Sequence, residues 1–495
     1  MKKNRMSRRD FLKTAAAGAA AAGLAGTLSK SFLKDMFPPV KAERIPINSA
    51  IIVGAGFAGL NAAMLLTEMG KEVTVLEKCH RPGGRCQTHT YPNGQHSTIS
   101  FSEWFSRQVD RPVWDLVEKF RLTEDVLTFD WDNFYYWRDE YHFDVWKDLI
   151  PQLPWDDEGG AQDFREFEDE VWFQGYICEP WEGTDYENYD YTDFKDWMLW
   201  NKQGKPHHRS DVEEFVNMNM KAEFGGPSNE VSAGEGISYW WYWDYSTFYQ
   251  LRQGNYHFIE ELCARIPPGA LHLNEPVYSV ENTANGVRAE TKEGTYTADV
   301  AIVAVDHTQV PNLVPELPSE RIAALQTMGA TKNIRPIAQF TERYWETKYG
   351  FWSWGGYTDH DVPKGGICCF HETNPQPGTQ GIMSMYVNEP ESTELWKTRK
   401  GIHVSQGAVN KLTDFMLNEM DKFWPGAHDY VIDESRLAFE FQPYGPQFKP
   451  RYVLDGTYVL NRQPIGKIYF AGDYVYGFGA SPALESAKDA ANNFT

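Results

Sequence analysis

The most constraining feature of the chain is a strand, a glycine-rich turn and a helix start that follow one another near its beginning. Residues 49–60 read SAIIVGAGFAGL, so a buried apolar run leads directly into three closely spaced glycines. One glycine permits the tight turn, a second lets a phosphate approach the backbone, and a third lets helix and strand pack. Backbone N–H groups and the helix N-terminus then point at a pyrophosphate. The segment predicts dinucleotide contacts from Gly54, Ala55, Gly56, Phe57, Ala58 and Gly59.

A second apolar strand, residues 72–77, supports this interpretation because it ends in an acid. Glu77 stands at about the spacing from the glycines at which an acidic residue binds the ribose hydroxyls. Lys78, directly after it, is a further predicted contact. A glycine-rich turn without a nucleotide is the alternative, since such turns are common.

Three further segments indicate which nucleotide is bound. Residues 81–88 read RPGGRCQT, a second glycine pair followed by an arginine, and residues 467–474 read KIYFAGDY. Residues 480–487, ASPALESA, would open a last helix, with Pro482 in its first turn. In their order these motifs resemble the flavin-containing amine oxidase family, which includes monoamine oxidases and L-amino-acid oxidases. The resemblance spans nearly the whole chain after the N-terminal segment, and it is strongest at the two ends.

The resemblance implies a bound FAD and a set of further contacts to it. Gly84 and Arg85 would approach the pyrophosphate, and Val277 would place its backbone against the adenine. Gly472 and Asp473 would meet the ribityl and pyrophosphate region, with Ala480 and Ser481 at the following helix N-terminus. Family members that bind flavin covalently use a cysteine near the C-terminal motif. No cysteine follows Cys369, so the FAD is expected to be noncovalent.

The fold class implied is α/β, with a Rossmann-like FAD-binding domain of the glutathione-reductase type and an α+β substrate-binding domain. The FAD-binding domain would be discontinuous, formed by residues 48–108, 253–305 and 452–495. Residues 109–252 and 306–451 would form the substrate-binding domain. Between residues 271 and 305, turns at Asn285-Gly286 and Glu293-Gly294 predict a small sheet followed by a return strand of the main sheet.

The first residues predict an export signal. Residues 7–13, SRRDFLK, have the form of a twin-arginine motif, and a small-residue apolar stretch over residues 14–28 follows. This stretch is too short and too rich in Ala and Gly for a secure membrane span. We expect cleavage after Ala42, no integral membrane span in the mature chain, and a periplasmic or secreted location; an uncleaved N-terminal anchor is the alternative. The twin-arginine pathway carries folded proteins, so a cofactor can be inserted before export.

The composition limits which kinds of molecule and ion the protein is expected to bind. A net charge of −22 argues against nucleic acid, whose phosphates need Lys and Arg. The six cysteines are scattered, and the pattern of cysteines and histidines predicts no metal site. An acidic, aromatic run over residues 156–197 predicts a surface excursion or a cavity rim. The aromatic run over residues 237–245 would be either core or the wall of a substrate tunnel.

The resemblance implies that a small-molecule amine or amino acid is oxidised by hydride transfer to flavin N5. The resulting imine would hydrolyse to an aldehyde or keto acid. An apolar pocket would disfavour the ammonium form of the substrate and align its carbon. Phe478, in YGFG, is expected to form one wall of an aromatic cage, and Tyr444, in QPYG, the facing wall. Core packing is the alternative for each.

The chain departs from the family at three places. The family commonly has a lysine, ten residues before a tryptophan, that holds a water at N5; here the position is Arg335, with Lys332 three residues away. Residues 97–105 lack the usual glycine pair. Phe105 falls where amino-acid oxidases carry a carboxylate-binding arginine, with Arg107 two residues on.

Arg335 leaves three roles open: stabilising the reduced flavin, binding a substrate carboxylate, or pairing with a neighbouring acid. It also favours a periplasmic cytochrome or quinone over oxygen as the electron acceptor. The leading hypothesis is an exported FAD-dependent amine oxidase or dehydrogenase. A desaturase-type flavin oxidoreductase and a noncatalytic FAD-binding subunit are the alternatives. The sequence leaves open the substrate, the oligomeric state and whether oxygen or a periplasmic cytochrome or quinone reoxidises the flavin.

Overall fold

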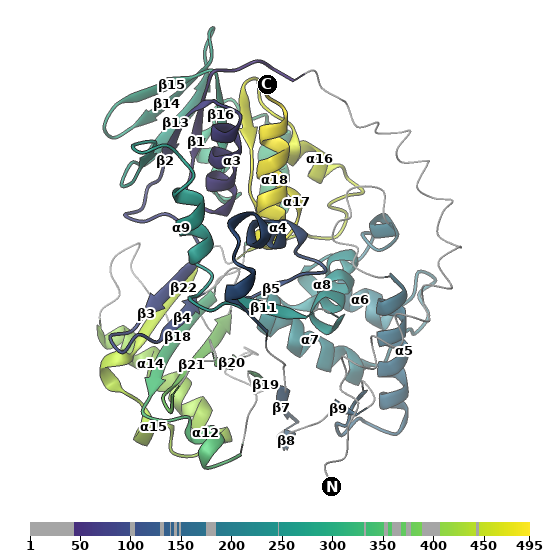
Figure 1. Cartoon of the computed structure of the whole chain (residues 1–495). Helices are drawn as coiled ribbons and strands as arrows, with labels where there is room; N and C mark the ends of the chain where they lie inside the picture. Colours follow the sequence, from purple (N-terminus) through teal and green to yellow (C-terminus); the bar gives the residue numbers. More distant parts are fainter. Residues whose placement is uncertain are drawn as a thin grey trace.

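The computed structural model describes residues 44–495 apart from 100–103, 129–132, 139, 143–145, 148–149, 175–184, 246, 331–332, 351–354, 359–367, 373–377, 389–405 and 442–444. Figure 1 shows these residues in two halves. The upper half of the view holds a parallel sheet with α3 and α18 beside it. The lower half holds a second sheet and most of the remaining helices.

A five-stranded parallel sheet organises the upper half, with strand order β12-β2-β1-β16-β24. Ile51 of β1 pairs with Thr74 on one side and Ala301 on the other. Because all these pairings are parallel, the carboxyl ends of the strands meet along one edge, where α/β sheets bind their ligands. The strands are β1 (Ser49–Val53), β2 (Glu72–Leu76), β12 (Leu271–His272), β16 (Val300–Val303) and β24 (Ile468–Phe470).

Both faces of this sheet are buried, because successive side chains of a strand point to opposite faces. Ala50 and Ile52 belong to the apolar cluster that includes α3 (Phe57–Glu68) and α18 (Ala480–Asn492). Ile51 and Val53 belong to the cluster on the other face, which includes a three-stranded antiparallel sheet. This explains why β1 is apolar throughout. The small sheet consists of β13 (Val277–Asn282), β14 (Val287–Thr291) and β15 (Thr295–Ala298).

The predicted small sheet and return strand are confirmed, with one correction. The turns fall at the two predicted glycines, where Thr283 N–H donates to the Gly286 carbonyl and Thr291 N–H to that of Gly294. Leu271 and His272, however, pair in parallel with β2, so they extend the main sheet and do not belong to the small one. The sequence showed the alternation of this segment, and the partner strand depends on the tertiary fold.

A seven-stranded sheet organises the lower half, with strand order β22-β18-β21-β20-β19-β7-β8. Ala338 and Phe340 of β18 pack with α14 (Gln406–Phe423) on one face. Ile337, with Tyr386 of β21, faces the cluster that includes helices α5 to α8. The strands are β7 (Asn133–Trp137), β8 (Glu140–His142), β18 (Asn333–Phe340), β19 (Gly355–Thr358), β20 (Cys368–Glu372), β21 (Gly381–Asn388) and β22 (Leu437–Phe441).

Four helices cover that second face, and three of them include residues of the two aromatic-rich runs. The four are α5 (Gly159–Gln174), α6 (Phe194–Leu199), α7 (Ser210–Phe224) and α8 (Ala233–Tyr245). Phe164 and Phe167 of α5 are fully buried, so the acidic run is more than the predicted surface excursion: it includes an amphipathic helix. Ile237 and Trp240 of α8 are also buried in this cluster, which assigns these two side chains to the core.

Shorter elements connect the two halves. Strand β11 pairs with β5 on one side and with β6 on the other, and β3 pairs with β4 in a hairpin. Their bounds are β3 (Gln87–Thr90), β4 (His96–Ile99), β5 (Phe105–Ser106), β6 (Val126–Thr128), β11 (Phe248–Leu251), β17 (Gly329–Ala330) and β23 (Pro446–Gln447), with helices α4 (Arg111–Phe120), α9 (His257–Cys263), α11 (Ser319–Thr327), α16 (Thr457–Arg462) and α17 (Asp473–Tyr476).

The two ends of the described chain lie side by side. Ile45 forms an isolated parallel bridge with Phe494, and Thr495 N–H donates to the Ile45 carbonyl at 3.0 Å. The last residues therefore hold the segment that leads into β1. Within the described ranges, no helix has both the length and the apolar character needed to cross a membrane.

Candidate functional site

A cavity of about 430 Å³ opens at the carboxyl edge of the parallel sheet. It collects residues from every predicted nucleotide-binding segment, although these segments lie far apart in the chain. Of the predicted contacts, the lining includes Gly54, Gly56, Phe57, Ala58, Glu77, Lys78, Gly84, Arg85, Val277, Gly472 and Asp473. Four predicted residues, Ala55, Gly59, Ala480 and Ser481, are not in the lining but belong to the turn and helix starts beside it.

The first glycine turn is shaped by two positions at which a side chain has no room. Gly54 has a φ of +100°, and a Cβ there would lie 2.5 Å from the Ala304 carbonyl oxygen. A Cβ on Gly59 would lie 1.9 Å from the Gly54 carbonyl oxygen, so α3 can pack on β1 only with glycine here. Gly56 differs, because a Cβ there meets nothing within 4 Å. It caps α3 without a side-chain acceptor, which leaves the first-turn N–H groups facing the cavity edge.

Glu77 is held in place by the turn that it faces. Its Oε2 accepts a hydrogen bond from Ala55 N–H at 2.8 Å, and its Oε1 accepts one from Cys79 N–H at 2.8 Å. Only 6% of the residue is exposed. Each carboxylate oxygen has a second lone pair, so the group can still accept hydroxyl donors from a ribose. This arrangement gives Ala55 a role that differs from direct contact: it orients the acid.

An ion pair links the second glycine segment to the C-terminal motif. Arg85 Nη2 lies 2.8 Å from Asp473 Oδ1, and Asp473 is 2% exposed. The other carboxylate oxygen, Oδ2, is buried and has no hydrogen-bond partner among the described residues. A buried acceptor of this kind needs a donor, and a hydroxyl of a bound dinucleotide fits that need. The residues present therefore suit the expected cofactor.

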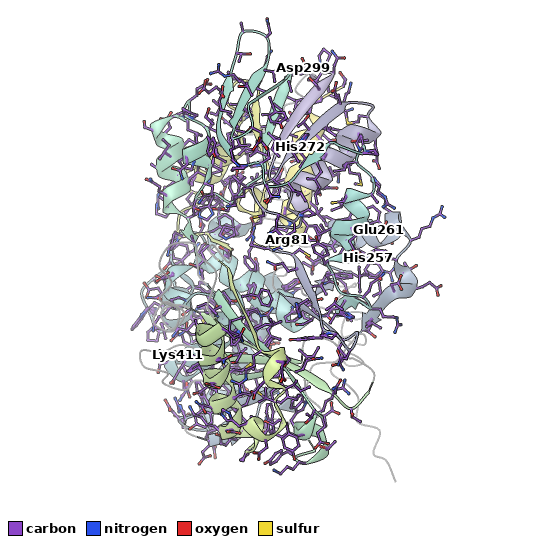
Figure 2. The ribbon with its side chains drawn as sticks, turned by 90° about the vertical axis from the view of Figure 1, so that its left-hand side faces the viewer. Arg81, His257, Glu261, His272, Asp299 and Lys411 are labelled. Carbon is purple, nitrogen blue, oxygen red and sulfur yellow. The ribbon has the colours of Figure 1, made fainter. Side chains whose placement is uncertain are left out.

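The Arg81 side chain stabilises the turn of the second glycine segment. Its guanidinium donates to the carbonyl oxygens of Pro82 and Gly84, both at 3.0 Å. Figure 2 places Arg81 at mid-height, below His272 of β12 and well below Asp299. The side chain thus folds back on its own turn, and it presents Gly84 to the cavity.

The segment after β16 is a part of the site that sequence reasoning missed. Ala304, Val305, Asp306 and Gln309 line the cavity. His307 beside them is 2% exposed, and its burial lowers its pKa, so the imidazole is neutral near neutral pH. The available signal was positional: these residues directly follow a parallel strand, and ligands bind at the carboxyl ends of such strands.

Phe478 lies where the two halves of the molecule meet. The half-buried ring packs against two apolar clusters: that of the parallel sheet, and that formed by helices α5 to α8 with the second sheet, called here the substrate side. Tyr239 of α8 approaches it edge-on, with ring centroids 6.5 Å apart. A Cβ on Gly445 would lie 2.0 Å from the Phe478 ring, so glycine is needed at that position. The neighbouring predicted residue, Tyr444, lies outside the described residues.

Arg335 is fully buried on the second sheet, on the face that Phe478 contacts. It pairs with Phe439 of β22, and directly paired residues present their side chains on the same face. Its guanidinium carbon lies 3.7 Å from the centroid of the Tyr386 ring, and Nη2 donates to Ser384 Oγ at 3.4 Å. The structure brings Arg335 and Phe478 to one cluster. It does not bring Arg335 into the lining of the dinucleotide cavity.

Of the other positions at which the chain departs from the family pattern, Phe105 lies in the core and Arg107 lies on the surface. Phe105 is 1% exposed and packs in the cluster of the parallel sheet, against Trp114 and Phe258. Arg107 is exposed, with its guanidinium 4.9 Å from the centroid of the Trp114 ring. Neither is arranged as a carboxylate-binding arginine of a buried site. Lys332 lies outside the described residues.

Two family models match the chain, one over its main part and one at its N-terminus. A model described as flavin containing amine oxidoreductase matches residues 57–494, and a model of the TAT (twin-arginine translocation) pathway signal sequence matches residues 5–25. The flavin-containing amine oxidase of Oncorhynchus mykiss is 23% identical over 461 residues, which cover 85% of this chain and 80% of the relative. The L-amino-acid oxidase of Demansia vestigiata is 23% identical over 454 residues, covering 86% and 82%.

Solved structures show the same fold. A putrescine oxidase double mutant superposes with a TM-score of 0.70 at 17% identity, covering 90% of this chain and 98% of its own. Cyclohexylamine oxidase from Brevibacterium oxydans superposes with a TM-score of 0.68 at 18% identity, covering 90% and 99%. The predicted α/β FAD-binding fold is therefore confirmed.

The two turn glycines give a matched pair of variants. Gly56→Ala should leave the protein folded, because its Cβ meets open space, but should weaken FAD binding about 10–100-fold by blocking the approach of the phosphate. Gly59→Ala should instead destabilise the fold, because its Cβ overlaps the Gly54 carbonyl. Fluorescence titration of the apoprotein with FAD and thermal unfolding by circular dichroism measure the two effects. A Gly56→Ala protein that binds FAD as tightly as wild type would contradict the assignment.

Proposed function

Because this chain belongs to the flavin-containing amine oxidoreductase family, we propose a specific reaction for it: oxidation of the C–N bond of a small amine or amino acid. The protein is an FAD-dependent amine oxidoreductase, and its signal sequence directs export by the twin-arginine pathway. The observation that carries the proposal is the position of Phe478: it follows the cavity-lining Asp473 by five residues, and its ring packs against both the apolar cluster of the parallel sheet and the aromatic cluster beside the second sheet. The residues assigned to the cofactor and to the substrate pocket are part of this proposal.

FAD, when bound, would supply a hydride acceptor at N5 for the substrate α-carbon, and the oxidised substrate would then be hydrolysed by water. The residues of the chain would prepare the substrate. Phe478, Tyr239 and the neighbouring aromatic residues would exclude water and favour the neutral amine over the ammonium ion, because burial disfavours the charged form. The segment that carries Tyr444 runs beside Phe478 at Gly445, so Tyr444 is proposed as the facing wall.

The same residues would hold the cofactor without a covalent bond. Glu77 would accept the ribose hydroxyls, and Asp473, paired with Arg85, would accept a hydroxyl of the ribityl chain. Cys79 lines the cavity, and burial together with the neighbouring Glu77 carboxylate raises the pKa of its thiol; Cys86 is fully buried, which raises the pKa of its thiol to about 12. A thiol that stays protonated is a poor nucleophile, which supports noncovalent FAD.

We propose that Arg335 sets the preference for the electron acceptor. It keeps a permanent positive charge on the sheet face that Phe478 contacts, where the family commonly has a lysine that holds a water. Its planar guanidinium stacks on the Tyr386 ring and donates to Ser384, a fixed fork that differs from a lysine ammonium that positions one water. This supports slow reaction with oxygen and faster turnover with a periplasmic cytochrome or quinone.

An anaerobic substrate screen tests the reaction. We expect at least one primary amine or amino acid to bleach the flavin absorbance, with one equivalent of aldehyde or keto acid and of ammonia released per flavin reduced. Phe478→Ala should slow the bleaching, with the FAD content unchanged. Bleaching only by compounds that yield a C=C bond would favour a desaturase. A flavin that no amine reduces, in fully FAD-loaded protein, would favour a noncatalytic subunit.

Replacement of Arg8 and Arg9 by lysine should block export of the full chain. Both arginines lie within the matched signal, so the folded, FAD-loaded precursor should accumulate in the cytoplasm. Cell fractionation with immunodetection measures this, and the bound flavin reports that the precursor has folded. The doubly substituted protein reaching the periplasm at the wild-type level would contradict the assignment.

Arg335→Lys should speed reoxidation of the reduced protein by oxygen at least about tenfold, which corresponds to a barrier change of about 1.4 kcal/mol. Stopped-flow absorbance measures the rate, and flavin content confirms folding. Arg321→Lys is the matched control: Arg321 is equally buried, lies 4.1 Å over the Phe470 ring and donates to the Asn461 and Gln463 carbonyls, away from the Arg335 face. Rapid wild-type reoxidation that neither Arg335→Lys nor Arg335→Ala changes would remove the proposed role.

A further inference from the structure

Two adjacent histidines and a glutamate converge at one point on the substrate side of the molecule. Glu170 lies on α5, and His207 and His208 lie in the connection between α6 and α7. In Figure 1, α5 stands at the right edge of the lower half, well separated from β1 and α3 in the upper half. The cluster is therefore distinct from the dinucleotide site.

The two imidazoles approach one carboxylate oxygen through the same ring nitrogen. His207 Nε2 lies 3.0 Å from Glu170 Oε2, and His208 Nε2 lies 3.5 Å from the same oxygen. Single ligand atoms from the three residues all lie within 4.8 Å of one another. Four ligands at ~2.0–2.1 Å from a tetrahedral zinc ion are about 3.3 Å apart. The two measured separations fall on either side of that value.

The opposite nitrogen of each ring faces an acceptor. His207 Nδ1 lies 2.9 Å from the Trp197 carbonyl oxygen, which accepts its N–H. His208 Nδ1 lies 3.6 Å from Asp163 Oδ1. A proton on Nδ1 places the lone pair of a neutral imidazole on Nε2, and histidine ligands of metals are normally oriented by such an outer acceptor. His207 Nε2 hydrogen-bonds to Glu170 Oε2 at 3.0 Å, so a metal ion would displace the Nε2 protons and be held by both imidazole lone pairs and the carboxylate.

The His208 ring is buried without a hydrogen bond to any residue that the structure describes, which favours a cation at this point. Its side chain is 4% exposed, and neither ring nitrogen has a hydrogen-bond partner among the described residues, since the nearest carboxylate oxygens stand at 3.5 and 3.6 Å. Phe167 and Trp197 pack against the ring. A buried imidazole whose nitrogens make no hydrogen bond is costly. A metal ion between the three groups would satisfy Nε2 of His208.

We propose that Glu170, His207 and His208 bind a divalent transition-metal ion, of which zinc is the best match. Two imidazole nitrogens and one carboxylate oxygen suit zinc, whereas calcium and magnesium prefer all-oxygen sites. Water would complete the coordination at the partly exposed side of Glu170. The ion would tie α5 to the α6–α7 connection and so stabilise this face of the substrate side.

The test uses the full chain, FAD-loaded, free of any histidine tag and treated with a chelator. We expect one Zn²⁺ per chain by isothermal titration, with two imidazole ligands by zinc K-edge X-ray absorption. Added Zn²⁺ should raise the melting temperature by about 2–5 °C. Glu170→Gln and His207→Gln should weaken Zn²⁺ binding more than about tenfold and abolish the rise, with the flavin spectrum unchanged.

His257→Gln is the matched control. His257 also faces two carboxylates, at 2.8 Å from Glu260 and 3.6 Å from Glu261, but it does so without a second histidine. Figure 2 shows His257 and Glu261 close together. This variant should bind Zn²⁺ as wild type does. Wild-type protein that takes up no stoichiometric Zn²⁺, or Glu170→Gln and His207→Gln proteins that bind it unchanged, would overturn the proposal.

Discussion

The parallel pairing of β1 with β2 and β16 is the constraint on which the rest of the structure depends. It brings the carboxyl ends of three strands to one edge, and β24 adds the C-terminal motif beside β16. Glu77, Asp306 and Asp473 each follow the end of one of these strands, so the pairing brings their carboxylates to the edge of the cavity. Arg85 and Asp473 come from opposite ends of the chain, yet they form an ion pair at this edge.

How much of this could be predicted depends on whether a signal is local. The turn at Gly54 and Gly59 is readable from sequence because the steric requirement acts within one strand–helix unit. The site role of Asp306 was missed, because it follows from the neighbouring strand and not from any motif around it. The same reason explains the error at Leu271: a two-residue strand has too little pattern to identify its partner.

The substrate side was less predictable from sequence. Several of its strands pair with strands that lie far away in the sequence, and its helices α5, α6 and α8 are all rich in aromatic residues, so composition does not tell them apart. Phe105 illustrates the limit of motif alignment: it matches a functional position in order, yet it packs in the core of the parallel sheet. In the sequence, Arg335 is identified only by its spacing of ten residues before Trp345. Its neighbours follow from the register of the sheet. The pairing of His207 and His208 with Glu170 had no spacing signal, since the carboxylate arrives from a separate helix.

Phe478 joins the two halves of the molecule through packing. Its ring contacts both apolar clusters, and Tyr239 of α8 packs against it edge-on. Asp473, five residues earlier on α17, has a buried oxygen without a hydrogen-bond partner among the described residues, which a hydroxyl of FAD would supply. Binding of FAD to the native state alone stabilises that state by mass action. Cofactor binding would therefore stabilise the folded protein before export, which suits a pathway that carries folded proteins.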